Sequence, residues 1–100
     1  MINKPLKLTL NFKWYDMIDT GEKLEEYRDI TPFYHARIDK YINAINRNEK
    51  VYVTFYKAYS TNRPCMTFEI DSIQQREGNL DWGAIPGNLY YCIKLGKRIN

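Results

Sequence analysis

The order in which the spacing of apolar residues changes along the chain constrains the fold more than any other feature. Leu6, Leu8 and Leu10 alternate with polar residues, which is typical of a strand with one buried face. Helical spacing follows at once and recurs later, separated by further strand-like segments. We expect helices over residues 12–20 and 32–45, and further strands over residues 23–29, 51–56, 65–75 and 89–95. Because these elements do not alternate as β-α-β units, they predict an α+β fold with a mostly antiparallel sheet.

Capping residues mark the expected ends of the two helices. Asn11 and Thr31 are suited to accept hydrogen bonds as N-caps, and Pro32 is favoured at the first helical position. Gly21 follows the first helix and can adopt the left-handed conformation that ends a helix. We assign Trp14 to the core, because the first helix carries few other large residues to bury.

The composition suits one folded domain over residues 1–100. Hydrophobic residues make up 44% of the chain, and nine Tyr, four Phe and two Trp supply large side chains for a core. The net charge of +3 is mild, so it permits an anionic partner only if the cations cluster. No apolar run reaches the roughly 18 residues of a membrane span, and residues 1–5 lack the apolar core of a signal peptide. We therefore expect a soluble, cytoplasmic protein without a membrane partner.

Metal and cofactor chemistry have no support in the sequence. Cys65 and Cys92 lack Cys-x-x-Cys spacing, so neither a zinc site nor a disulfide framework is indicated. Both lie in apolar strand-like runs, where we expect reduced thiols that behave as small apolar residues. His35 has no second histidine at ligand spacing and is expected at the surface. We expect no metal and no cofactor, since Walker-type and Rossmann motifs are also missing.

The segment from Asp19 to Arg28 is where we expect the chemistry. Lys23 follows a turn at Gly21, and strand alternation places Glu26 and Arg28 on one side. We predict that Lys23, Glu26 and Arg28 line one concave pocket together with at least one aromatic residue, either from residues 56–59 or Trp82. A partly desolvated lysine beside another cation loses its proton more easily, whereas a carboxylate opposes that loss. The alternative interpretation is a helix-to-strand connection with ordinary surface charges.

The same segment carries a family resemblance. Gly21, Lys23 and Arg28 match a Gly-x-Lys-x-x-x-x-Arg segment that follows the first helix, and the chain thereby resembles the ASCH domain of the PUA-like superfamily. The flanking matches are Trp14, Ile18, Thr31-Pro32-Phe33-Tyr34, Val53-Thr54-Phe55-Tyr56, Asp81-Trp82-Gly83-Ala84 and Tyr90-Tyr91-Cys92-Ile93-Lys94-Leu95-Gly96. The resemblance implies a small, mostly antiparallel β-barrel with two flanking helices.

Binding of RNA or of a nucleotide-like molecule is the function that we expect first. Lys23 and Arg28 can hold a phosphate or a base edge, and Arg63, in a turn, can extend that surface. The candidates for stacking on a base are Tyr56, Tyr59 and Trp82. A purely structural role in the core is the alternative for each aromatic residue.

A small hydrolase is the second expected function. Some ASCH-like proteins are implicated in ribonuclease activity, and one branch removes acyl groups from modified cytidine. In that branch the motif has Thr three residues after the lysine, where this chain has Glu26. The branch also has a later acidic residue, for which Glu69, Glu77 and Asp81 are the candidates here. In such an enzyme Lys23 would be the base or nucleophile, with Glu26 as a proton relay.

Overall fold

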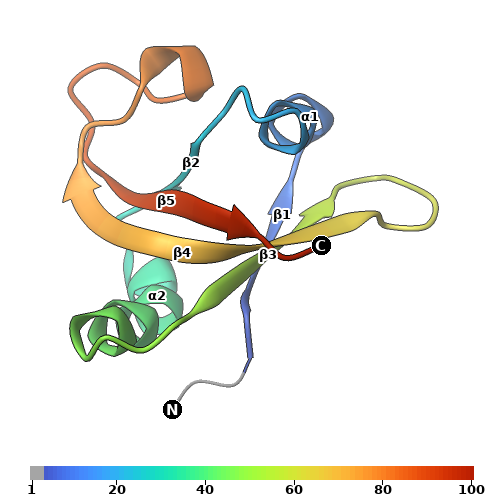
Figure 1. The fold of residues 1–100 in the computed structure, drawn as a ribbon. Helices are drawn as coiled ribbons and strands as arrows, with labels where there is room; N and C mark the ends of the chain where they lie inside the picture. Colours follow the sequence, from blue (N-terminus) through green and yellow to red (C-terminus); the bar gives the residue numbers. More distant parts are fainter. Residues whose placement is uncertain (1–3) are drawn as a thin grey trace.

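The computed structural model describes residues 4–100 and contains a curled five-stranded sheet with two α-helices (Figure 1). The helices are α1 (Phe12–Asp19) and α2 (Pro32–Asn46), with a short 3₁₀ helix, η1 (Leu80–Trp82). The strands are β1 (Leu6–Leu10), β2 (Glu25–Asp29), β3 (Tyr52–Lys57), β4 (Cys65–Arg76) and β5 (Tyr90–Arg98). The predicted element order is confirmed, and most predicted bounds differ from these by one or two residues.

The strands are ordered β1-β3-β4-β5-β2 in the sheet. The pairs β3–β4, β4–β5 and β5–β2 are antiparallel, and β1–β3 is parallel. This arrangement confirms the α+β fold and the mostly antiparallel sheet that the sequence predicts. The sequence also predicts a barrel, whereas the strand order found within residues 4–100 leaves β1 and β2 as edges, so the sheet is a curled half-barrel.

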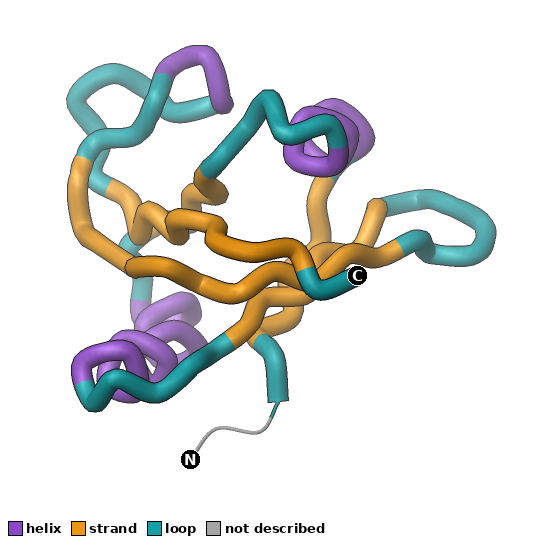
Figure 2. Tube along the Cα trace, viewed as in Figure 1, coloured by secondary structure: helices purple, strands orange, loops and turns teal. Residues whose placement is uncertain are grey.

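The curl comes from the long strand β4. Its first half pairs with β3, from Cys65 to Glu69, and its second half pairs with β5 as far as Arg76. The register with β5 shifts between Phe68 and Ser72, and such bulges bend a strand and increase its twist. Figure 2 shows the bent strand leading into the longest connection, residues 77–89, which contains η1.

The helices lie above and below the sheet as it is drawn in Figure 1, with α1 above and α2 below. Both predicted N-caps are confirmed, since Asn11 Oδ1 accepts the N–H of Trp14 at 3.0 Å and Thr31 Oγ1 accepts the N–H of Tyr34 at 3.2 Å. The assignment of Trp14 to the core is wrong. Tyr15 and Ile18 are the buried residues of α1, and Trp14 is half-buried because its ring packs against the 77–89 connection. None of the helices within residues 4–100 is both long and apolar enough to cross a bilayer.

The main core lies between the concave side of the sheet and the two helices. Its members are Leu6, Leu8, Leu10, Tyr15, Ile18, Ile38, Tyr41, Ala44, Val51, Val53, Phe55, Met66, Phe68, Ile70, Tyr91 and Ile93. Cys92 is buried as predicted, but Cys65 is exposed, because it begins β4 on the face opposite to Met66 and Phe68. The predicted surface position of His35 is confirmed. Since Leu6, Leu8 and Leu10 face the core, Lys7 and Thr9 face outward on β1.

Candidate functional site

A tight turn before β2 directs Lys23 into the protein. Gly21 has a φ of 83°, in the left-handed region, and its N–H donates to the carbonyl of Ile18. The N–H of Lys23 then donates to the carbonyl of Met17 at 2.9 Å. The Lys23 residue is 1% exposed, so the lysine that was predicted to line a pocket is almost completely buried. A buried ammonium must be satisfied by protein groups.

A carboxylate, a carbonyl and two aromatic rings surround the Lys23 ammonium. Its Nζ lies 3.1 Å from Oε1 of Glu26 and donates to the main-chain carbonyl of Trp82 at 2.9 Å. The same atom lies 5.2 Å from the centroid of the Trp14 ring and 4.7 Å from that of Tyr27, within cation–π range. Contact between this ammonium and a ligand would therefore require the main chain at Trp82 to move away.

Arg28 extends this ion pair and connects the two edge strands. Its Nη2 lies 2.7 Å from Oε2 of Glu26 and donates to the carbonyl of Thr9 in β1 at 3.1 Å. Its Nη1 donates to the hydroxyl of Tyr34 at 3.2 Å. We call Lys23, Glu26 and Arg28 the buried ion cluster. The structure thus confirms that Glu26 and Arg28 share a side of β2 and that Lys23 meets them there.

The pKa values of the two cations in this cluster shift in opposite directions. Burial lowers the pKa of Lys23, and the nearby Glu26 carboxylate offsets only part of that effect. Burial acts on the pKa of Arg28 in the same direction, but the Glu26 carboxylate and the Tyr34 hydroxyl outweigh it and the net shift is upward. Lys23 is therefore the cation that can lose a proton, as an amine base or nucleophile must.

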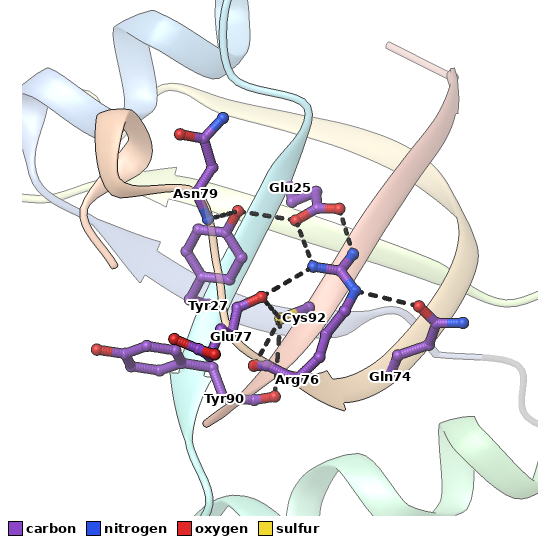
Figure 3. A network of polar contacts seen from close by, with 8 residues as sticks. All are labelled: Glu25, Tyr27, Gln74, Arg76, Glu77, Asn79, Tyr90 and Cys92. Carbon is purple, nitrogen blue, oxygen red and sulfur yellow. Dashed lines mark hydrogen bonds and ion pairs between the residues drawn. The ribbon is translucent and has the colours of Figure 1, made fainter. Parts of the chain in front are cut away.

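A second polar network joins β2 to the start of the 77–89 connection (Figure 3). Both carboxylate oxygens of Glu25 accept hydrogen bonds from Arg76, and the Tyr27 hydroxyl donates to Glu25 at 2.7 Å. The N–H of Asn79 donates to that hydroxyl at 2.9 Å, just before η1. Burial raises the pKa of Glu25, but these hydrogen bonds lower it by more. The network anchors the start of the segment whose Trp82 carbonyl binds Lys23.

The other predicted site residues lie in three places. Trp82 is half-buried and presents its carbonyl, not a free ring face, to Lys23. Tyr56 is half-buried in β3, opposite Thr9 of β1, and the Arg63 guanidinium lies 5.2 Å from the centroid of its ring. Tyr59 is 98% exposed in the loop between β3 and β4, with a φ of 57°. The structure therefore brings Tyr56 and Arg63 together on the surface.

Two pockets flank β1 and contain cations that the site prediction missed. The β3 pocket has a volume of about 370 Å³ and is lined by Lys7, Thr9, Tyr56 and Arg63. The α2 pocket has a volume of about 330 Å³ and is lined by Lys4, Pro5, Leu6, Lys7, Ala36, Arg37, Lys40 and Tyr41. We call the two pockets together the β1 face. Strand and helix periodicity already placed Lys7, Arg37 and Lys40 outward, but a single sequence does not show that β1 lies beside α2.

The charge of the β1 face contrasts with that of a third pocket. Among residues 4–100, no acidic residue lines either pocket of the β1 face, whereas Glu49, Glu69 and Asp71 line the third, with Lys50 as its one cation. We call the third the acidic pocket. Within residues 4–100, no three His, Cys, Asp or Glu side chains are placed to hold a metal ion.

Comparison with known proteins supplies no relative for this chain. No protein-family model, no curated protein and no solved structure matches it. The resemblance to the ASCH domain therefore stays a prediction, and the function has to be inferred from side-chain chemistry.

Proposed function

We propose that this protein binds single-stranded RNA or a nucleotide-like ligand through the β1 face. The supporting observation is that Lys4, Lys7, Arg37, Lys40 and Arg63 line its two pockets with no acidic residue among the lining. On a chain whose net charge is only +3, this is a local concentration of positive charge. Such a concentration attracts phosphate groups even when the whole molecule is only mildly basic.

Aromatic side chains favour a nucleic acid over a simple anion. Tyr56 lines the β3 pocket beside Arg63, and Tyr59 presents almost its whole ring to solvent in the next loop. Proteins that bind single strands combine cations along the backbone with aromatic rings on which bases stack. A site for free phosphate or an acidic peptide has no need of exposed rings. We also propose that the half-barrel is a PUA-like, ASCH-type domain, which the spacing of Gly21, Lys23 and Arg28 supports.

This function is tested by removing two cations of the β1 face. Fluorescence anisotropy with a labelled single-stranded RNA should give an affinity that falls with salt. The double variant Lys7→Gln/Arg63→Gln should bind more weakly and show a salt slope smaller by about 1.4, since each lost phosphate contact on a single strand contributes about 0.7. Its melting temperature should hardly change, because exposed cations contribute little to stability.

The matched control removes two cations elsewhere. Lys50 lines the acidic pocket, and Lys97 lies exposed on β5, which β3 and β4 separate from β1 in the sheet. Lys50→Gln/Lys97→Gln lowers the net charge by the same amount. Equal losses of affinity in the two double variants would mean that RNA responds to total charge and would reject the β1 face as the site.

A small hydrolase is the second candidate, and one observation favours it. Lys23 is buried with a lowered pKa and lies 3.1 Å from a carboxylate that can relay a proton. In that reading Lys23 is the base or nucleophile for an RNA or an acylated nucleoside. Turnover followed by chromatography should vanish in Lys23→Arg, because arginine keeps the charge but does not lose a proton. Turnover that persists in both Lys23→Arg and Lys23→Met would eliminate this function.

A further inference from the structure

We infer that the ligand of the β1 face is an oligonucleotide of about four nucleotides that occupies both pockets at once, rather than a mononucleotide. This inference rests on the proposed function and specifies its substrate class. It follows from the size of each pocket, from the residue that the pockets share and from the cation–aromatic pair at each pocket.

The size of each pocket limits what it can hold. The volumes of about 370 Å³ and 330 Å³ lie near the lower end of the roughly 300–1,000 Å³ that is usual for small-molecule sites. Each pocket therefore suits one nucleotide-sized group. A longer ligand has to continue from one pocket into the other.

Lys7 lies between the two pockets, because it lines both. Figure 1 shows β1 between α2 and the loop that joins β3 to β4. The strand runs from Leu6 to Leu10, and four steps of about 3.3 Å give a track of about 13 Å. A stacked single strand advances about 3.4 Å per nucleotide, so this track matches about four nucleotides.

A cation lies against an aromatic ring at each of the two pockets. Beside the α2 pocket, the Arg37 guanidinium lies 3.6 Å from the centroid of the Phe33 ring, which is 55% exposed. In the β3 pocket, Arg63 lies 5.2 Å from the centroid of the Tyr56 ring. A guanidinium against a ring offers charge for a phosphate next to a planar surface for a base. Two such pairs on either side of Lys7 match two separated nucleotides of one strand.

The experiment compares ligand lengths in competition with a labelled RNA. The unlabelled competitors are uridine monophosphate and uridine oligonucleotides of about two, four and eight nucleotides. Affinity should rise at least about tenfold from the dinucleotide to the tetranucleotide, because only the longer ligand reaches both pockets. From four to eight nucleotides the affinity should rise only by a statistical factor, because a longer oligonucleotide can place several of its four-nucleotide segments in the same two pockets.

Variants of each pocket identify the part of the ligand that it holds. Arg37→Gln/Lys40→Gln should weaken the tetranucleotide roughly fivefold and leave the monophosphate unchanged, since Tyr56 favours binding of a single nucleotide in the β3 pocket. Arg63→Gln should weaken both ligands. Thermal melting of each variant checks that it is folded.

The outcomes separate this inference from the proposed function. If the monophosphate competes as well as the tetranucleotide, or if Arg37→Gln/Lys40→Gln leaves the tetranucleotide unaffected, the two-pocket ligand is refuted. The proposed function then survives as long as Lys7→Gln/Arg63→Gln still weakens binding. If no RNA or nucleotide binds the unmodified protein, the proposed function fails and this inference fails with it.

Discussion

The buried ion cluster and the β1 face use the same residue types in opposite surroundings. Lys23 is buried, Arg28 is half-buried and both share the carboxylate of Glu26, whereas Lys7 and Arg63 line a surface pocket without an acid. Burial of charge demands a partner, because desolvation costs several kcal/mol for each ion. Exposed cations have no such demand and remain able to meet a ligand. A cation's role therefore depends on whether the fold supplies its counter-charge.

The largest expected effect comes from removing the shared carboxylate. Glu26→Gln leaves the buried Lys23 and the half-buried Arg28 without a counter-ion and should lower the free energy of unfolding by about 3–5 kcal/mol. Chemical denaturation measures this loss. Glu69→Gln is the control, because Glu69 pairs with the exposed Lys50 at 3.3 Å and should cost at most about 1 kcal/mol. Similar losses in both variants would remove the distinction between buried and exposed charge.

A pair of glycine substitutions tests how the main chain at Trp82 is held over Lys23. Gly83 has a φ of 100°, and a Cβ there would lie 2.7 Å from Cζ2 of Trp14. Gly83→Ala should therefore cost about 3 kcal/mol, from backbone strain and from the displaced ring. Gly21 also has a positive φ but has open space around it, so Gly21→Ala should cost only about 1 kcal/mol. Equal losses of stability in Gly83→Ala and Gly21→Ala would show that the contact between Gly83 and Trp14 does not hold the main chain at Trp82 in place.

The exposed ring of Tyr59 should show the opposite behaviour to the buried ion cluster, with an effect on RNA binding and almost none on stability. Tyr59→Ala should weaken RNA binding by about 1–3 kcal/mol, the usual contribution of one stacked base. Stability should change by less than about 0.5 kcal/mol, since the side chain is 98% exposed. Leu80→Ala, at a position 58% exposed in η1, is the control and should change neither quantity. Unchanged RNA affinity in Tyr59→Ala would exclude stacking at this ring.

The smallest expected effect is a pH dependence of stability from Lys23. Because burial lowers the pKa of Lys23 from its ordinary value of 10.5, the native state binds fewer protons than the unfolded chain between the two pKa values. The free energy of unfolding should therefore rise with pH across that interval, and its Lys23 contribution should be least favourable below the folded-state pKa. Denaturation between about pH 7 and pH 10 should show a flatter profile for Lys23→Met. Lys97→Met is the control, and a profile that is equally steep in Lys23→Met would contradict the lowered pKa.

Local signals in the sequence predicted the elements well. Helix caps such as Asn11 and Thr31, and alternation in β1, depend only on neighbouring residues, so their positions followed from short-range chemistry. The position of Glu26 and Arg28 on the same side of β2 also followed from alternation along the strand. Trp14 was misassigned because the burial of a helix residue depends on which elements pack against each face.

The parts that failed depend on contacts between distant segments. Nothing near Lys23 in the sequence indicates that the carbonyl of Trp82 covers its ammonium. Alternation placed Lys7 outward but did not show that it shares pockets with Arg37 and Arg63. Parallel pairing of β1 with β3 creates that grouping, and such a pairing requires a crossover that local patterns do not specify.

The position of β5 also has a consequence for how the chain folds during synthesis. Within residues 4–100, β2 pairs only with β5 in the sheet, and β5 is the last of the described strands in sequence order. Until residues 90–98 have left the ribosome, β2 has no neighbouring strand and Glu26 and Arg28 lack their native enclosure. Because such long-range pairing slows folding, we expect the nascent chain to complete its sheet late, with β1 paired to β3 before β2 joins the sheet.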